Sequence, residues 1–274
     1  MNTSATTATP PALRVAETYA IAFRRTYRGS VFSTILNPIL FLGAMGLGLG
    51  SLVDGGVGSS NLNGLDYVEF LAPGLLAATA MQTAAFETTY PVMAGFKWMR
   101  SYEAMLVTPL TATDIAVGTI VWAGARVAMA TAAFTVVAAL FGALASPLAI
   151  LAFPAAVLTG LAFAGVIAGW TAGQESEYSL SNLFRFAVVP LFLFSGTFFP
   201  IEQLPNWLEP VAWVVPLWHG VELCRHLCLG EPELLDVVHV AYLTGELNDR
   251  PRKGLGYDTP AVRFATETAA ITTR

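Results

Sequence analysis

The sequence predicts an all-α integral membrane protein: a helical bundle of five full transmembrane helices with an incomplete sixth, an N-terminal amphipathic helix and outer re-entrant helices. Apolar residues make up 55% of the 274 positions and charged residues only 12%, so polar side chains are too few to cover a water-exposed surface. The apolar residues gather in runs close to the roughly 20 residues that a helix needs to cross the hydrocarbon core. These runs are unbroken, whereas the strands of a membrane barrel alternate apolar with polar residues.

Four apolar runs supply the five predicted spans. The third run contains one ionisable residue, Arg126, and is long enough for two spans with a turn at Ser146-Pro147. The other three runs contain no ionisable residue. The last run belongs to the fifth span, which begins at Arg185 and ends at Pro200. The runs are Val31 to Val53, Phe70 to Phe86, Ile115 to Gly173 and Phe186 to Ile201.

The orientation follows from the basic residues beside these spans, because Lys and Arg concentrate on the cytoplasmic side. They fall on one side of the membrane: Arg14, Arg24, Arg25, Arg28, Lys97, Arg100 and Arg185. We therefore expect a cytoplasmic N-terminus, residues 1–30. Met1 to Pro11 lacks the basic start of a cleavable signal peptide. Ala12 to Ser30 interleaves apolar residues with arginines, which indicates an amphipathic helix on the inner leaflet, with a soluble tail as the alternative.

Two connecting segments are too apolar to be ordinary loops. Val92 to Asp114 mixes charges with Met, Phe and Trp at helical spacing, which predicts a short helix that either rests on lipid or docks on a partner. Glu202 to Gly230 contains three prolines and three tryptophans. It predicts short helices dipping into the outer interface, with simple tryptophan anchoring as the alternative.

Residues that could carry chemistry are few. No Gly-x-x-x-x-Gly-Lys-[Ser/Thr] sequence occurs, so the chain has no phosphate-binding loop for ATP. Arg126 lies inside a span, where it either lines a translocation path or pairs with Glu87 at a helix end. The small residues Gly43, Gly46, Gly48 and Gly50 lie within the first span, and close helix packing explains them better than a phosphate site.

The histidines and cysteines stand at spacings that could suggest a metal site. Cys224 and Cys228 stand near His219 and His226, with His239 further on. A packed or wet helix face explains this spacing better, because it implies neither an acidic second shell nor an open tetrahedral set of ligands.

Several stretches share a pattern with a known family. They are Phe86 to Tyr90, Glu103 to Leu110, Asp114-Ile115, Thr159 to Ala164, and Phe194 to Pro200 followed by Gln203 to Pro205. The most specific is Ser-Gly-x-x-Phe-Pro, followed by Pro216-Leu217-x-His219. From about Arg24 to Leu243 the chain resembles the type-2 ABC exporter permeases, in the branch of nodulation-factor and antibiotic-resistance permeases.

The resemblance implies a multi-pass protein of the plasma membrane, in bacteria the cell inner membrane. Its partners would be a separate ABC ATPase, a second permease subunit, identical or different, and membrane lipid. This chain would hold no cofactor, since ATP and Mg²⁺ belong to the ATPase. The resemblance also implies an ATPase-coupling helix (Gly95, Phe96, Lys97, Trp98, Met99, Arg100, Tyr102, Glu103, Met105, Leu106), and an outer gate (Ser195, Gly196, Phe199, Pro200, Pro205, Trp207, Pro216, His219). Glu87 and Arg126 are the candidates for the translocation path.

The C-terminal part departs from the family. Residues 31–243 form the predicted permease domain, but only Val237 to Leu243 remain for a sixth span, far fewer than the roughly 20 required. Residues 244–274 resemble the end of an insertion-element transposase, which suggests a gene fusion, and we expect this tail to be disordered. Its basic run from Arg250 to Lys253 could suit nucleic acid or headgroups, but we expect no nucleic-acid partner.

The sequence thus predicts a permease subunit that exports an amphipathic substrate, a lipo-oligosaccharide or a hydrophobic drug. It is not expected to be an enzyme itself. Two alternatives remain: a membrane-embedded transferase or hydrolase, and a non-transporting permease remnant left by the fusion. Co-purification with an ATPase and ATP-dependent efflux would separate them.

Overall fold

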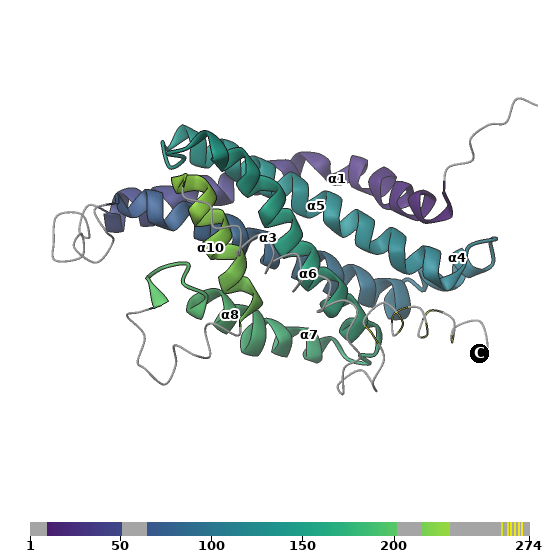
Figure 1. Ribbon diagram of the computed structural model, residues 1–274. Helices are drawn as coiled ribbons and strands as arrows, with labels where there is room; N and C mark the ends of the chain where they lie inside the picture. The colour runs from purple at the N-terminus through teal and green to yellow at the C-terminus, as the bar shows by residue number, and fades with distance from the viewer. Residues whose placement is uncertain are drawn as a thin grey trace, which may run out of the picture.

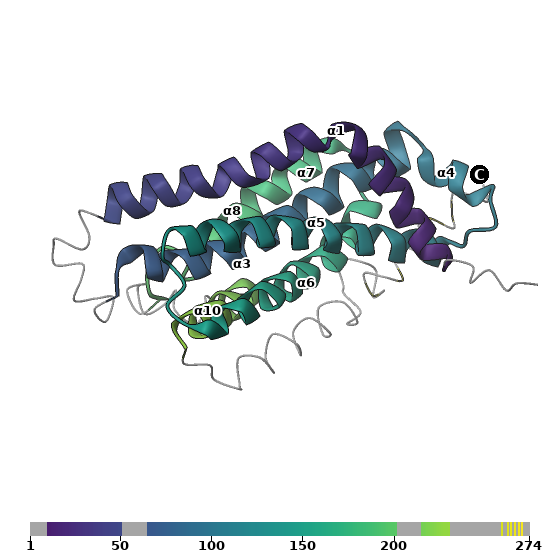
Figure 2. The same cartoon turned by 90° about the horizontal axis from the view of Figure 1, so that it is seen from above.

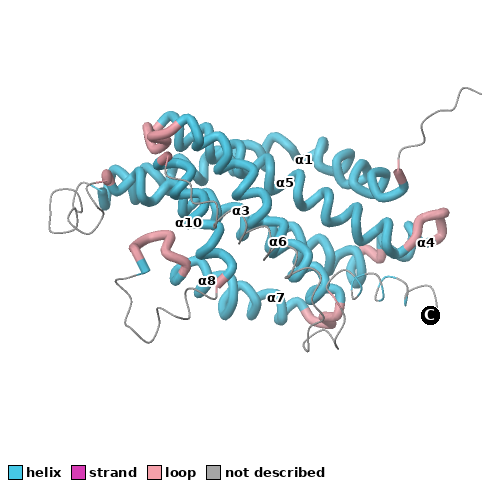
Figure 3. Tube along the Cα trace, in the orientation of Figure 1, coloured by secondary structure: helices cyan, strands magenta, loops and turns pink. Residues whose placement is uncertain are grey.

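The computed structural model describes residues 10–50, 65–201 and 215–230, together with Thr259 and every second residue from Val262 to Ala270. Over these residues the chain forms helices and loops and no strand (Figure 3). The predicted outer loop up to residue 64, the residues 202–214 and the incomplete sixth span lie outside the described part.

The helices run lengthwise along one bundle (Figure 1). Turns of π-helix, labelled η1, η3 and η5, continue α-helices without a break, and η4 is a 3₁₀ turn. In chain order the elements are α1 (Pro11–Phe41), η1 (Leu42–Leu49), α3 (Tyr67–Met93), η3 (Ala94–Trp98), α4 (Ser101–Leu106), α5 (Ala112–Leu140), η4 (Pro147–Leu151), α6 (Ala152–Ala172), α7 (Glu177–Leu183), η5 (Phe184–Val188), α8 (Val189–Phe194) and α10 (Pro216–Leu229).

The bundle has two ends, which we name after the short helices that mark them. At the α4 end lie the start of α1, the end of α3, α4 and the start of α7; at the α10 end lie the end of α1, the start of α3, the end of α8 and α10 (Figures 1 and 2). The predicted amphipathic helix and the first span form one continuous helix, α1, followed by η1.

The centre of the bundle is α3, which packs against α5, α6 and α10, while α1 lies along α5. Small residues let these helices approach closely. Ala77, Ala80 and Ala84 of α3 are fully buried, and a Cβ atom on Gly160 of α6 would come within 3.0 Å of the Ala80 carbonyl oxygen. Close contact explains Gly46 in the same way, since a Cβ there would lie 2.8 Å from Val68, but Gly43 and Gly48 have open space beside them.

Large apolar side chains cover the outside of the bundle. Within the described part of the chain, three helices are long and apolar enough to cross a membrane: Pro11–Gly46, Ala112–Leu140 and Pro147–Ala172. Exposed side chains on the bundle include Phe32, Leu40, Val136, Leu140 and Phe186. Such a surface is stable against lipid and costly against water.

One predicted turn is confirmed, and the predicted end of the fifth span is not. Ser146 ends the loop between α5 and α6 by accepting a hydrogen bond from the Leu148 N–H at 3.2 Å, so the predicted turn is confirmed. The fifth span was predicted to run to Pro200, which is wrong: α8 ends at Phe194, because Gly196 has a φ of +75° that a helix cannot accommodate.

Candidate functional site

At the α4 end the chain reverses sharply through the predicted coupling helix. The π-helical turn η3 carries α3 on to Trp98, Arg100 has a φ of +50°, and α4 then packs against η3. A non-glycine residue with positive φ is uncommon and costs about 1 kcal/mol or more. The reversal therefore depends on the contacts that hold its two arms together.

Those contacts are aromatic and buried. The Tyr102 side chain of α4 is 0% exposed and lies so close to η3 that a Cβ on Gly95 would overlap its ring. Phe96 packs edge-to-face on the same ring, with centroids 4.9 Å apart. The Tyr102 and Tyr19 hydroxyls are 3.1 Å apart, which links α4 to α1. Burial, with a smaller contribution from Tyr19, raises the pKa of Tyr102 well above its usual value, so this residue stays a neutral phenol.

The opposite side of this reversal faces outward. Trp98 is 52% exposed and Met99 is 78% exposed, and Lys97 and Arg100 are exposed beside them. Exposed aromatic and methionine side chains with cations beside them are typical of protein interfaces. Of the other predicted coupling residues, Met105 and Leu106 pack on the buried cluster, and Glu103 lies 3.8 Å from Arg100.

Arg126 and Glu87 form an ion pair inside the bundle. The Arg126 Nε lies 2.8 Å from a Glu87 carboxylate oxygen, and both side chains are about five-sixths buried. A second guanidinium nitrogen donates to the Ser30 hydroxyl at 2.9 Å, and the Arg126 Cζ lies 4.5 Å from the Phe23 ring centroid. The pairing that the sequence left as one alternative is therefore present, and it ties α1, α3 and α5 together.

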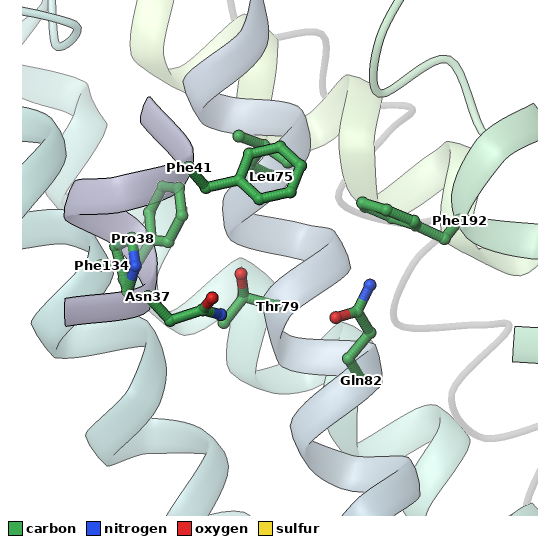
Figure 4. Close-up of a pocket in the computed structure, with 8 residues that line it drawn as sticks. All are labelled: Asn37, Pro38, Phe41, Leu75, Thr79, Gln82, Phe134 and Phe192. Carbon is green, nitrogen blue, oxygen red and sulfur yellow. The ribbon is translucent and has the colours of Figure 1, made fainter. Parts of the chain in front are cut away.

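A cavity of about 130 Å³ lies between α1, α3, α5 and α8. Figure 4 shows the Asn37 amide of α1 pointing toward Thr79, with Gln82 nearby on α3. Apolar side chains complete the lining: Pro38, Phe41, Leu75, Phe134 and Phe192. Thr79 and Gln82 are near the middle of α3, where lipid tails offer polar groups no hydrogen bond. The cavity therefore provides a polar patch in an apolar wall.

At the α10 end, the turn after α8 is wedged between α3 and α10. The Ser195 and Thr197 hydroxyls are 2.8 Å apart and buried. A Cβ on Gly74 of α3 would come within 3.0 Å of the Thr197 backbone. Phe199 and Trp218 pack around Ile201, and the Trp218 and His219 rings are in edge contact.

Arg225 of α10 holds this arrangement together, and sequence reasoning missed it. Its guanidinium donates to the Gly196 carbonyl at 2.7 Å and to the Glu222 carboxylate, and its Cζ lies 4.0 Å from the Phe70 ring centroid. The side chain is 8% exposed. One signal was available in the sequence, since Arg225 is the one basic residue in the predicted outer segment. Of the predicted outer-gate residues, Pro200 follows the turn and Pro216 begins α10, while Pro205 and Trp207 lie outside the described part.

No metal site forms among the described residues, where no group of three or more His, Cys, Asp or Glu side chains could hold an ion. Cys224 and Cys228 are free and buried in α10, and the Cys224 thiol is 3.7 Å from the Ala152 carbonyl oxygen. The packed helix face preferred from the sequence is what the structure shows here. His239 is outside the described part.

Comparison with known proteins agrees with this reading of the fold. Residues 18–229 match the ABC-2 type transporter family. The chain is 35% identical to Nodulation protein J of Rhizobium leguminosarum bv. trifolii, over 81% of this chain and 83% of that protein. It is 32% identical to Nodulation protein J of Rhizobium meliloti, over 83% of both. It is also 24% identical to the Inner membrane transport permease YadH of Escherichia coli, over 72% of this chain and 76% of that protein. No solved structure matches the chain.

Proposed function

We propose that this chain exports an amphipathic substrate across the plasma membrane. The chain belongs to the ABC-2 type transporter family; it is a multi-pass membrane protein and a transport permease subunit. The observation that carries the proposal is the combination of two features of one bundle. An exposed aromatic and cationic surface lies at its α4 end, and a polar patch opens in its apolar wall.

The bundle supplies five crossings in this proposal. Three are the long apolar helices; the others are α3, with 27 residues, and the continuous α7, η5 and α8, from Glu177 to Phe194. The α4 end is cytoplasmic, since Arg14, Arg24 and Lys97 lie there. The N-terminus is then in the cytoplasm and α10 lies in the outer half of the membrane.

The partner at the α4 end is a separate ATPase. An ABC transporter requires an ATPase, and the sequence of this chain contains no phosphate-binding loop of its own. The exposed Trp98 and Met99 are suited to a groove on that subunit, and the close contact of Gly95 with Tyr102 makes the reversal rigid enough to transmit its movement to α3.

The substrate path runs beside Asn37, Thr79 and Gln82. Asn37 is exposed and Gln82 is partly exposed, although amides at this depth need a polar partner. A second permease subunit facing α1 and α8 would enclose the patch and give the amides a polar neighbour. A polar patch edged by phenylalanines is suited to a substrate with a polar head and an apolar body, such as a lipo-oligosaccharide or a hydrophobic drug.

The test is reconstitution. The chain is co-expressed with an ABC ATPase from the same organism, purified by a tag on the chain, and placed in liposomes with a fluorescent amphipathic drug or a labelled lipo-oligosaccharide. We expect the ATPase to co-purify and ATP to drive export, with both ATP hydrolysis and export lost when the ATPase carries a Walker A lysine-to-alanine substitution. Co-purification without ATP-driven export of either substrate would contradict the proposal and support the transport-inactive remnant. Hydrolysis by the chain alone would contradict the assignment of ATP to a partner.

A further inference from the structure

The C-terminal segment makes a buried contact with the coupling reversal at the α4 end. We use "Phe264 segment" for its described residues Thr259, Val262, Phe264, Thr266, Thr268 and Ala270. The family match ends at Leu229, so this contact is made by a part of the chain that the family does not account for. The sequence predicts disorder here, whereas the described residues from Val262 to Ala270 are helical.

The contact is a triangle of aromatic rings. The Phe264 ring centroid lies 5.6 Å from that of Phe96 and 5.9 Å from that of Tyr102, both in edge-to-face geometry. Phe264 is 2% exposed. Edge-to-face pairs at this separation are favourable beyond the area that they bury.

The Phe264 segment has a buried face and an exposed face. Thr268, one helical turn after Phe264, is 0% exposed, and its hydroxyl donates to the Phe264 carbonyl at 2.8 Å. Val262 is 49% exposed, and Thr266 and Ala270 are exposed too. At its start the Thr259 hydroxyl accepts a hydrogen bond from the Val262 N–H at 3.2 Å, which is the geometry of a helix cap. This pattern is that of a short amphipathic helix docked by one face.

The Phe264 segment supports the reversal without covering its outward surface. Phe264 contacts the ring of Tyr102, which already joins η3, α4 and α1, while Trp98 and Met99 stay exposed. The docked helix and the partner surface therefore lie on different sides of the same reversal.

We propose that the Phe264 segment is a working part of the coupling end: Phe264 is a positioning residue that holds Phe96 and Tyr102 so that Trp98 and Met99 meet the ATPase in one geometry. The role in coupling rests on the proposed function, but the docking itself does not. It follows that the segment lies on the same side of the membrane as Tyr19 of α1. Gly230, where the family match ends, lies at the other end of the bundle, beside Ser146.

The docking is tested first, on the full chain in membranes and without any partner. Benzoylphenylalanine replaces Phe264 in one variant and the exposed Val262 in a matched control, and the photo-adducts are mapped by mass spectrometry. We expect Phe264→benzoylphenylalanine to react with the peptides of residues 92–110, and the Val262 variant to react there at least fivefold less. Equal reaction from the two positions, or adducts of the Phe264 variant elsewhere, would overturn the docking.

Coupling is then tested in the complex with the co-purified ATPase. Phe264→Ala is expected to keep the complex assembled and to lower the maximal substrate-stimulated ATP hydrolysis at least threefold. The ATP concentration for half-maximal rate should stay unchanged, because Phe264 does not touch nucleotide. Phe264→Leu should restore most of the rate, and Val262→Ala should match the unmodified chain. If Phe264→Ala behaves like Val262→Ala, the positioning role is wrong. If no ATPase co-purifies with the unmodified chain, the proposed function fails, while the photo-adducts still decide the docking.

Discussion

Replacing Glu87 with glutamine tests the buried ion pair between α3 and α5. The variant leaves the Arg126 guanidinium, 16% exposed, without the carboxylate that lies 2.8 Å away. Removing one partner of a buried pair costs about 3–5 kcal/mol, because the remaining charge stays in a medium that solvates it poorly. We expect about 3 kcal/mol, since Ser30 at 2.9 Å and the Phe23 ring at 4.5 Å still stabilise the cation.

The assay is the apparent melting temperature of the detergent-solubilised chain, followed by size-exclusion chromatography after heating. For a chain of this size, 1 kcal/mol corresponds to about 2–4 °C, so Glu87→Gln should lower the melting temperature by about 6–12 °C. The Arg126→Gln substitution should also lower the melting temperature. The double variant removes both charges and keeps polar side chains that can bond to each other, so it should recover more than half of the loss.

A second ion pair in the chain supplies the control. Arg100 and Glu103 are 3.8 Å apart and their side chains are 71% and 42% exposed. Exposed pairs contribute about 0–1 kcal/mol, so Glu103→Gln should lower the melting temperature by less than about 4 °C. Our reasoning is refuted if Glu87→Gln and Glu103→Gln have equal effects. It is also refuted if the double variant loses the sum of the two single losses, because coupled partners do not add in that way.

Three further substitutions probe the other regions. Gly95→Ala places a methyl group on the Tyr102 ring; we expect about 1–3 kcal/mol of destabilisation and at least tenfold weaker co-purification of the ATPase, both measured on one preparation. Arg225→Lys keeps the charge but loses the planar guanidinium that donates to the Gly196 carbonyl. We expect the free energy of unfolding to fall by about 1–3 kcal/mol, measured by thermal unfolding. A change within error would contradict the stabilising role of this hydrogen bond. Gln82→Leu removes an amide from the cavity; we expect export of a polar-headed substrate to fall at least fivefold with assembly and stability unchanged, and unaltered export would remove this residue from the path.

The helices could be predicted from the sequence because their signals are local. Runs without ionisable residues define the spans, and Ser146-Pro147 carries its own turn chemistry, in which the serine caps the following 3₁₀ turn. The end of the fifth span could not be predicted in this way. Residues from Ser195 to Pro200 contain no ionisable side chain, so the run continues through them, and hydropathy does not report that Gly196 adopts a positive φ.

The site was only partly predictable, for a different reason. The cost of an arginine inside a span indicates that it needs a partner, and Glu87 was the acid near the right depth. The contact of Arg225 with Gly196 joins residues 29 positions apart, and it depends on how α10 packs against the turn after α8. Asn37 and Gln82 are amides within apolar runs, which is a signal that could have been noted. That they share one cavity follows only from the packing of α1 on α3.

Among the described residues, α3 is the element that reaches every region discussed above. Its 27 residues extend over about 40 Å at 1.5 Å per residue, from the region of Gly74, beside the turn after α8, to η3 at the α4 end. Its two prolines, Pro73 and Pro91, each lack the N–H that would bond to the carbonyl four residues earlier, so the helix bends most easily at those points. Between them the helix is uninterrupted and carries Thr79, Gln82 and Glu87. A movement of the reversal at the α4 end would therefore either bend α3 at Pro91 or shift this middle part as one body, and Glu87, fixed to α5 through Arg126, would resist the shift.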